Sequence, residues 1–165
     1  MNKRLKSILI NVLIFLSVYF AVHYYQTRLT PTGQAPEISG WLLEGKEFEG
    51  LHKLDEPILV HFWATWCKVC ELEQGSINDI AKDYHVITIA SQSGSVAEVR
   101  KYQVENELSF PIIVDQSGLL AKQWGIIGFP SSFVLDKNND IKFVEVGYST
   151  EMGLKLRLWL ASFFG

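Results

Sequence analysis

Twenty-one consecutive residues near the start of the chain, Ser7–Thr27, contain no Asp, Glu, Lys or Arg. As an α-helix, such a segment is about 30 Å long, which matches the hydrocarbon core of a lipid bilayer. If a membrane takes up this segment, residues 37–165 of the 165-residue chain remain for a folded body, which is enough for one hydrophobic core. The sequence therefore predicts an anchor at residues 7–27 and a single domain.

The charges around this segment predict its orientation. Lys3, Arg4 and Lys6 precede it, whereas only Arg28 follows closely. The positive-inside rule then places residues 1–6 in the cytoplasm and the domain outside it, in the periplasm or its equivalent, held at the inner (cell) membrane by one helix. A cleaved signal peptide and a buried core helix are the competing interpretations. Aromatic residues crowd the end where a signal peptide needs small ones, which favours an uncleaved anchor.

Residues 28–36 are predicted to be a tether, because they contain prolines and a glycine and show no apolar periodicity. The domain is expected to occupy residues 37–165. It holds 11 basic and 18 acidic residues, a net charge of −7, so a nucleic acid is not an expected partner.

Short apolar runs alternate with helical patterns in the domain. Residues 57–63, 86–90 and 110–115 are typical of buried strands, and residues 69–84 and 95–106 are typical of helices. This alternation predicts an α/β fold with parallel strands joined by right-handed crossovers.

The second half of the domain carries a different signal. Residues 132–135 and 141–146 flank a polar turn and predict an antiparallel hairpin. An amphipathic helix is expected over residues 151–164, and a short hairpin is expected within residues 38–50.

Cys67 and Cys70 are separated by two residues and stand directly between a predicted buried strand and a predicted helix. Unpaired N–H groups and the positive end of the helix dipole favour a thiolate at Cys67, and Lys68 adds a nearby positive charge. A thiolate is the nucleophile in disulfide exchange, and the second thiol can attack the resulting mixed disulfide. Cys67 is therefore predicted to attack and Cys70 to resolve, forming a Cys67–Cys70 disulfide.

Other uses of the cysteine pair are weaker. A c-type haem site needs histidine directly after the second cysteine, where Glu71 stands, and none of the four histidines has a zinc-ligand spacing. A purely structural disulfide remains an alternative. Disulfide exchange needs no cofactor and no metal, because the two sulfurs carry the chemistry.

The octapeptide Trp-Ala-Thr-Trp-Cys-Lys-Val-Cys at residues 63–70, together with the later segment Gly128–Phe133, resembles the thioredoxin superfamily. More narrowly, residues 37–165 and the anchor resemble membrane-anchored extracytoplasmic thioredoxin-like proteins of the TlpA and ResA kind. The tail at residues 146–159 is similar to that of the suppressor-of-copper-sensitivity D subfamily.

The resemblance implies a thioredoxin-like three-layer fold, with a central mixed sheet between flanking helices. It implies a protein thiol–disulfide oxidoreductase, and it favours a reductase that receives electrons from a membrane donor of the DsbD type and acts on proteins with disulfides or thiols. It also implies a cis peptide bond between Phe129 and Pro130. The loop that contains this bond is expected to lie beside the cysteines and to bind an extended substrate segment. Trp66 is expected to border this substrate site.

Glu73 follows Cys70 by three residues, so a helix places it beside the resolving cysteine. In the related reductases an acid at this position relays protons; the alternative is a solvated carboxylate like Glu71.

His61 stands where many members of the superfamily carry a buried aspartate, and is either a packed core histidine or a proton carrier. Gly75 stands where many relatives have a proline that kinks the helix, so the sequence supports the predicted helix less strongly beyond residue 74.

Trp63 is expected to be a core residue, and Trp66 is expected to shield Cys70 while leaving Cys67 open, an arrangement that suits disulfide exchange.

Two other functions compete with disulfide exchange. A copper carrier would use the two thiolates as Cu(I) ligands, but copper-carrying relatives separate their cysteines by three residues and add a distant histidine, whereas no histidine follows His85 here. A redox-inert interaction module would need an unreactive Cys67.

Overall fold

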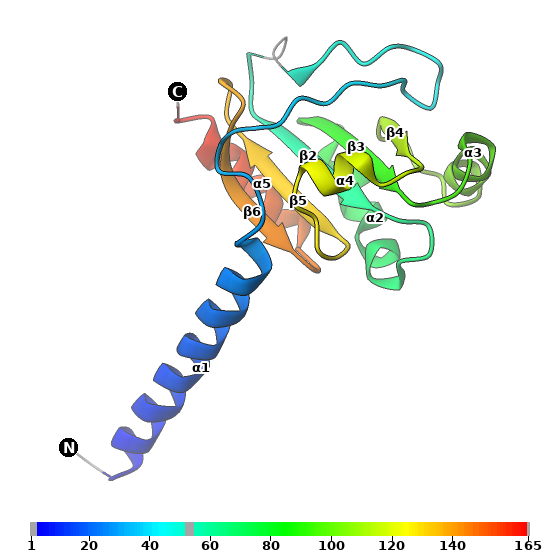
Figure 1. The fold of residues 1–165 in the computed structure, drawn as a ribbon. Helices are drawn as coiled ribbons and strands as arrows, with labels where there is room; N and C mark the ends of the chain where they lie inside the picture. Colours follow the sequence, from blue (N-terminus) through cyan, green and yellow to red (C-terminus); the bar gives the residue numbers. More distant parts are fainter. Residues whose placement is uncertain (1–2, 52–54, 165) are drawn as a thin grey trace.

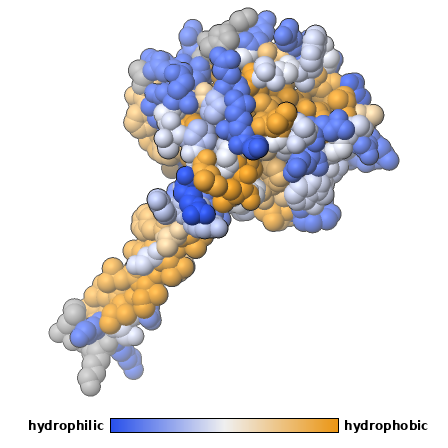
Figure 2. All heavy atoms as spheres, viewed as in Figure 1, coloured by the Kyte–Doolittle hydropathy of each residue, from blue (hydrophilic) through white to orange (hydrophobic). Residues whose placement is uncertain are grey.

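The computed structural model describes residues 3–51 and 55–164, and for Lys3 it describes the backbone alone. Met1 and Asn2 of the predicted cytoplasmic head lie outside the described residues. The first element, α1 (Lys3–Thr27), projects away from the rest of the chain (Figure 1). Its surface is mostly apolar (Figure 2), and Arg4–Thr27 is long and apolar enough to cross a membrane, a property that it shares with signal sequences.

The described strands form one mixed sheet in the order β1-β6-β5-β2-β3-β4 (Figure 1). Strands β2, β3 and β4 are parallel, whereas β1, β5 and β6 pair with their neighbours in antiparallel fashion. The strands are β1 (Gly33–Gln34), β2 (Ile58–Trp63), β3 (His85–Ser91), β4 (Ile112–Asp115), β5 (Ser131–Leu135) and β6 (Asp140–Val146). The remaining helices are α2 (Lys68–Ile80), α3 (Val96–Glu105), α4 (Leu119–Gln123) and α5 (Glu151–Ala161).

Strand β2 is buried along its whole length and divides the hydrophobic core in two. Leu59 and Trp63 point to one face, where residues of α2, α3 and α5 cover them. Val60 and Phe62 point to the other face, which is covered by α4 and by part of the segment before β2. Because successive side chains of a strand alternate between faces, His61 shares the first face with Leu59 and Trp63. The expected three-layer α/β fold with a central mixed sheet is confirmed.

Helix α2 is continuous from Lys68 to Ile80, so Gly75 does not interrupt it. Glycine weakens a helix through backbone entropy but keeps the N–H that proline lacks, so the hydrogen-bond ladder continues. Helix α2 ends four residues before the predicted boundary at residue 84, and its buried residues pack against α5.

The tether prediction is wrong for Gly33 and Gln34, which pair with Ile141 and Asp140 on β6. Strand β6 leaves one edge of its backbone open, and an extended segment can fill that edge whatever its side chains. The adjacent Ala35 is buried, so the folded body takes in residues that were expected to precede it.

Three smaller differences have local causes. Strand β4 begins at Ile112 and not at residue 110, because Pro111 cannot donate to the ladder. The hairpin expected within residues 38–50 is reduced to one bridge between Trp41 and Glu47. The short helix α4 was not predicted, since its N-cap, Gly118, provides no side-chain signal.

Candidate active site

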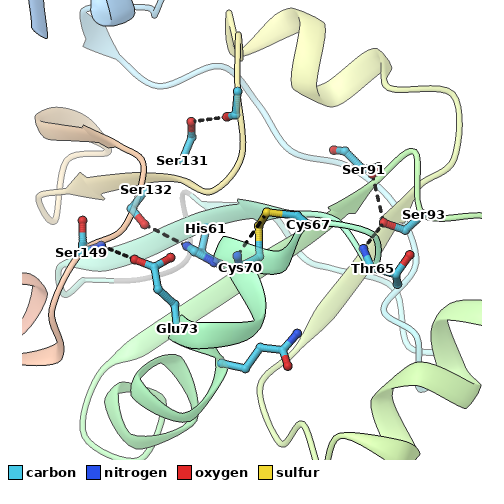
Figure 3. The surroundings of a disulfide bond; sticks show 12 residues. His61, Thr65, Cys67, Cys70, Glu73, Ser91, Ser93, Ser131, Ser132 and Ser149 are labelled. Atoms are coloured by element: carbon cyan, nitrogen blue, oxygen red, sulfur yellow. Dashed lines mark hydrogen bonds between the residues drawn. A yellow bond between two sulfur atoms is a disulfide. The ribbon is translucent and has the colours of Figure 1, made fainter. Parts of the chain in front are cut away.

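The two cysteines form a disulfide at the point where the chain leaves the central strand β2 and enters α2 (Figure 3). Their Cα atoms are 5.3 Å apart. Cys67 is 7% exposed and Cys70 is 1% exposed, so a partner approaching from solvent meets Cys67 first. The strand fixes the start of the loop in the core, and the helix fixes its end.

Cys67 is the N-cap residue of α2, and its Sγ atom accepts a hydrogen bond from the backbone N–H of Cys70 at 3.1 Å. This N–H is one of the donors that a helix start leaves without a backbone acceptor. The side chain of Lys68 is 90% exposed, and its ammonium lies 3.1 Å from Glu71. The helix start therefore provides positive potential at the Cys67 sulfur.

Glu73 is fully buried, in contrast to Glu71, which is about half exposed. The backbone N–H of Ser149 donates a hydrogen bond to Oε1 of Glu73, while Oε2 is buried with no hydrogen-bond partner among the described residues (Figure 3). Burial raises the pKa of the Glu73 carboxyl to about 7, although the Ser149 hydrogen bond opposes this change. The alternative interpretation of Glu73, a solvated carboxylate on the helix surface, is therefore wrong.

His61 is buried on the sheet face that α2 covers, and its Nδ1 atom lies 2.8 Å from Oγ of Ser132, its register partner on β5 (Figure 3). Burial lowers the pKa of His61 to about 3, so the ring is neutral at physiological pH. This agrees with the packed core interpretation of His61. Ser132 and Ser149 lie within the segments that carry the resemblance, but sequence reasoning gave neither a role, since a serine does not reveal a buried partner far away in the sequence.

The loop before β5 lies across from the disulfide and contains a cis peptide bond between Phe129 and Pro130. Oγ of Ser131 donates a hydrogen bond to the carbonyl of Gly128 at 2.8 Å, which ties the two sides of the loop together (Figure 3). The rings of Phe129 and Trp66 pack in a T-shaped arrangement, with centroids 5.7 Å apart.

Trp66 and Trp63 have different surroundings. Trp66 is 61% exposed, and its indole N–H donates to the carbonyl of Gln92 at 3.0 Å. Trp63 is buried and packs against Tyr102 and Phe110, as expected of a core residue. The exposed Trp66 and the partly buried Phe129 therefore form the border of the disulfide.

A groove of about 690 Å³ lies beside this border. Its lining residues come from α4 and the loops on either side of it, from the loop between β2 and α2, from the residue after β3 and from the segment after α1. They include Leu29, Trp66, Lys122, Ile126, Ile127 and Phe129. Within residues 3–51 and 55–164, no group of three or more His, Cys, Asp or Glu side chains could hold a metal ion.

The model of the AhpC/TSA family matches residues 31–144. A thioredoxin-like protein of Haemophilus influenzae is 33% identical over 167 residues, which cover 99% of this chain and 98% of the relative. The thiol-disulfide oxidoreductase ResA of Bacillus thuringiensis is 30% identical over 113 residues, 66% of this chain and 65% of its own. The crystal structure of StoA from Bacillus subtilis superposes with a TM-score of 0.65 at 25% identity, covering 73% of this chain and 95% of StoA.

Proposed function

We propose that this chain reduces disulfides of partner proteins outside the cytoplasm. The chain belongs to the AhpC/TSA family of thioredoxin-like proteins and is a thiol–disulfide oxidoreductase. The observation that carries the proposal is the position of Cys67. Its sulfur caps α2, is the more accessible of the two, and is bordered by the exposed Trp66 and the partly buried Phe129.

The exchange takes place in two steps. The Cys67 thiolate attacks one sulfur of the partner's disulfide, forming a mixed disulfide and releasing the partner's other sulfur as a thiolate. The Cys70 thiolate then attacks the Cys67 sulfur, which closes the Cys67–Cys70 disulfide and releases the second partner thiolate. The partner gains two electrons and, after protonation, two protons, while the cysteine pair is oxidised.

Glu73 is the proposed proton acceptor for Cys70. It lies one helical turn beyond that cysteine, and its carboxyl group has a pKa close to neutral, where an acid–base group works best. The unpartnered Oε2 atom has a free acceptor position for the thiol proton. His61, being neutral and paired with Ser132, has a packing role in this scheme.

Trp66, Phe129 and Pro130 are the proposed substrate contacts. The loop before β5 presents backbone groups beside the cysteine pair, and an extended partner segment can pair with such groups. The exposed side chain of Trp66 and the partly buried side chain of Phe129 provide apolar contact area next to Cys67.

The proposed arrangement in the cell uses α1 as an uncleaved anchor. Residues 1–6 then lie in the cytoplasm, residues 7–27 span the inner membrane, residues 28–32 connect, and residues 33–165 hold the periplasmic catalytic domain. A membrane donor of the DsbD type would return electrons to the Cys67–Cys70 disulfide. The length, composition and exposure of α1 support this arrangement.

The decisive experiment is the equilibrium reduction potential of the Cys67–Cys70 couple, measured on the full chain in a glutathione buffer. Thioredoxin-like couples span roughly −270 to −120 mV. A reductase is expected near the negative end of this range, because its dithiol must give up electrons to protein disulfides. A potential near the positive end would reverse the assigned direction and make the protein an oxidant.

A further inference from the structure

The segment that follows α1 lies directly against the loop between α4 and β5. Gly125 has a left-handed backbone with φ of +64°, and a Cβ atom at this position would overlap the backbone carbonyl of Leu29. The same atom would stand 3.1 Å from the Cα atom of Thr30. Glycine at residue 125 therefore permits both an unusual conformation and the close approach of a second backbone.

This approach brings Leu29 into the groove beside the disulfide. Leu29 lines the same groove as Trp66 and Phe129, the two aromatic residues that border Cys67. Ile126 and Ile127 extend the apolar lining, and Lys122 is the one charged side chain among its described lining residues. The groove is thus mostly apolar and continuous with the border of the redox site.

We propose that Leu29 is a specificity-determining residue of the exchange reaction. It forms one wall of a groove that receives an apolar side chain flanking the reactive cysteine of an extended protein substrate. The inference rests on the proposed exchange with proteins and adds a substrate preference to it. The continuity of the groove with Trp66, the residue before Cys67, favours a segment of the bound substrate as the occupant, since such a segment must pass there.

The test uses the reduced full chain in detergent micelles and two synthetic octapeptides. Each peptide has one cysteine blocked by glutathione, and the peptides differ only in having leucine or serine next to that cysteine. Glutathione disulfide serves as a small probe that reaches Cys67 without filling the groove. The measured quantity is the ratio of the leucine-peptide rate to the serine-peptide rate.

Leu29→Ser is expected to lower this ratio by about 3–10-fold, because one wall of the apolar site is lost, while the rate with glutathione disulfide stays unchanged. Leu119→Ser is the matched control. Leu119 is 68% exposed, similar to the 61% of Leu29, and is not among the described lining residues. The control should keep the wild-type ratio.

Gly125→Asn tests the same wall of the groove by displacing the backbone of Leu29 without changing its side chain. Asparagine tolerates a left-handed conformation better than other side chains, so the collision with Leu29 is the main change. Gly45→Asn is its control, since Gly45 has φ of +90° and no described atom lies within 4 Å of its added Cβ. Gly125→Asn should lower the rate ratio as Leu29→Ser does, and Gly45→Asn should not.

Two results would overturn the inference. One is a ratio within twofold of wild type in Leu29→Ser; the other is an equal loss of rate with glutathione disulfide, which would place the effect at the cysteines. A wild-type protein that reduces neither the peptides nor glutathione disulfide would instead contradict the proposed function itself.

Discussion

The backbone N–H of Ser149, in the loop between β6 and α5, donates a hydrogen bond to the buried carboxylate of Glu73 on α2. This contact joins residues that are 76 positions apart in the sequence. It leaves the second carboxylate oxygen without a partner among the described residues, one helical turn from Cys70. A buried acid with one satisfied and one free oxygen is suited to exchange a proton.

Glu73→Gln is therefore expected to slow dithiol–disulfide cycling, most strongly above pH 7, where the native carboxyl is ionised and can accept the Cys70 proton. A positioned proton acceptor contributes about 10²–10⁴-fold to a rate. The measurement is the rate of disulfide reduction from pH 5 to 9. Glu71→Gln is the control, because Glu71 is half exposed on the same helix. Identical pH profiles for the two variants would remove the relay role.

The same carboxyl should make stability depend on pH. Its folded pKa of about 7 lies above the unfolded value near 4.5, so the folded protein binds this proton more tightly. The stability contribution is complete below pH 4.5 and is lost as the pH rises through 7, with a size of the order of 1–3 kcal/mol. In thermal unfolding of the oxidised chain, Glu73→Gln should gain stability relative to wild type as the pH rises. Parallel curves from pH 4.5 to 8.5 would contradict this.

The proposed roles of the cysteines predict opposite trapping results. Cys70→Ser should accumulate mixed disulfides with partner proteins, because Cys67 still attacks while the resolving thiol is absent. Non-reducing electrophoresis of cell extracts would show these adducts, and a reducing agent would cleave them. Cys67→Ser is the matched variant and should trap few partners. Stronger trapping by Cys67→Ser would reverse the two roles.

Ser132→Ala should destabilise the fold by roughly 1–3 kcal/mol, because it removes the buried partner of the His61 ring. The measurement is the free energy of unfolding in denaturant for the oxidised chain. Ser39→Ala, at an exposed serine, should stay within about 0.5 kcal/mol of wild type. An equal effect of both substitutions would show that the His61–Ser132 contact does not stabilise the domain.

Cell fractionation should leave the chain in the inner membrane at full length, with the domain open to protease from the periplasmic side. The expectation follows from the length and apolar surface of α1 and from the basic residues before it. Mass spectrometry of the purified protein gives its N-terminus. A soluble product that begins near residue 28 would identify α1 as a cleaved signal peptide.

The elements that the sequence predicted well are those with strong local patterns. Strand β2 is a fully apolar run except for His61, and α2 begins at its cysteine cap. Strand β1 could not be predicted, because it pairs through backbone groups that every extended segment possesses. The five-residue helix α4 lacks both a side-chain cap and a long periodic pattern.

The site was predictable as far as its motifs extended. Cys67 and Cys70 form a disulfide, the Phe129–Pro130 bond is cis, and Phe129 packs against the core cluster that contains both cysteines. The roles of these residues in exchange stay predictions. The position of Glu73 was evident from helical spacing, whereas its burial depends on the chain near Ser149, which only the tertiary structure brings close. The partner of His61 depends on strand register, which the sequence leaves open. The narrower likeness to the copper-sensitivity subfamily stays a prediction.

The pairing of Gly33 with β6 limits how far the domain can lie from the end of α1. Residues 28–32 are all that separate α1 from this strand, and a fully extended chain of that length reaches about 20 Å at most. If α1 spans the membrane as proposed, the disulfide stays within a thin layer over the bilayer surface. Membrane-bound donors and substrates would then meet it by a search in two dimensions, at a local concentration far above that of a freely diffusing protein.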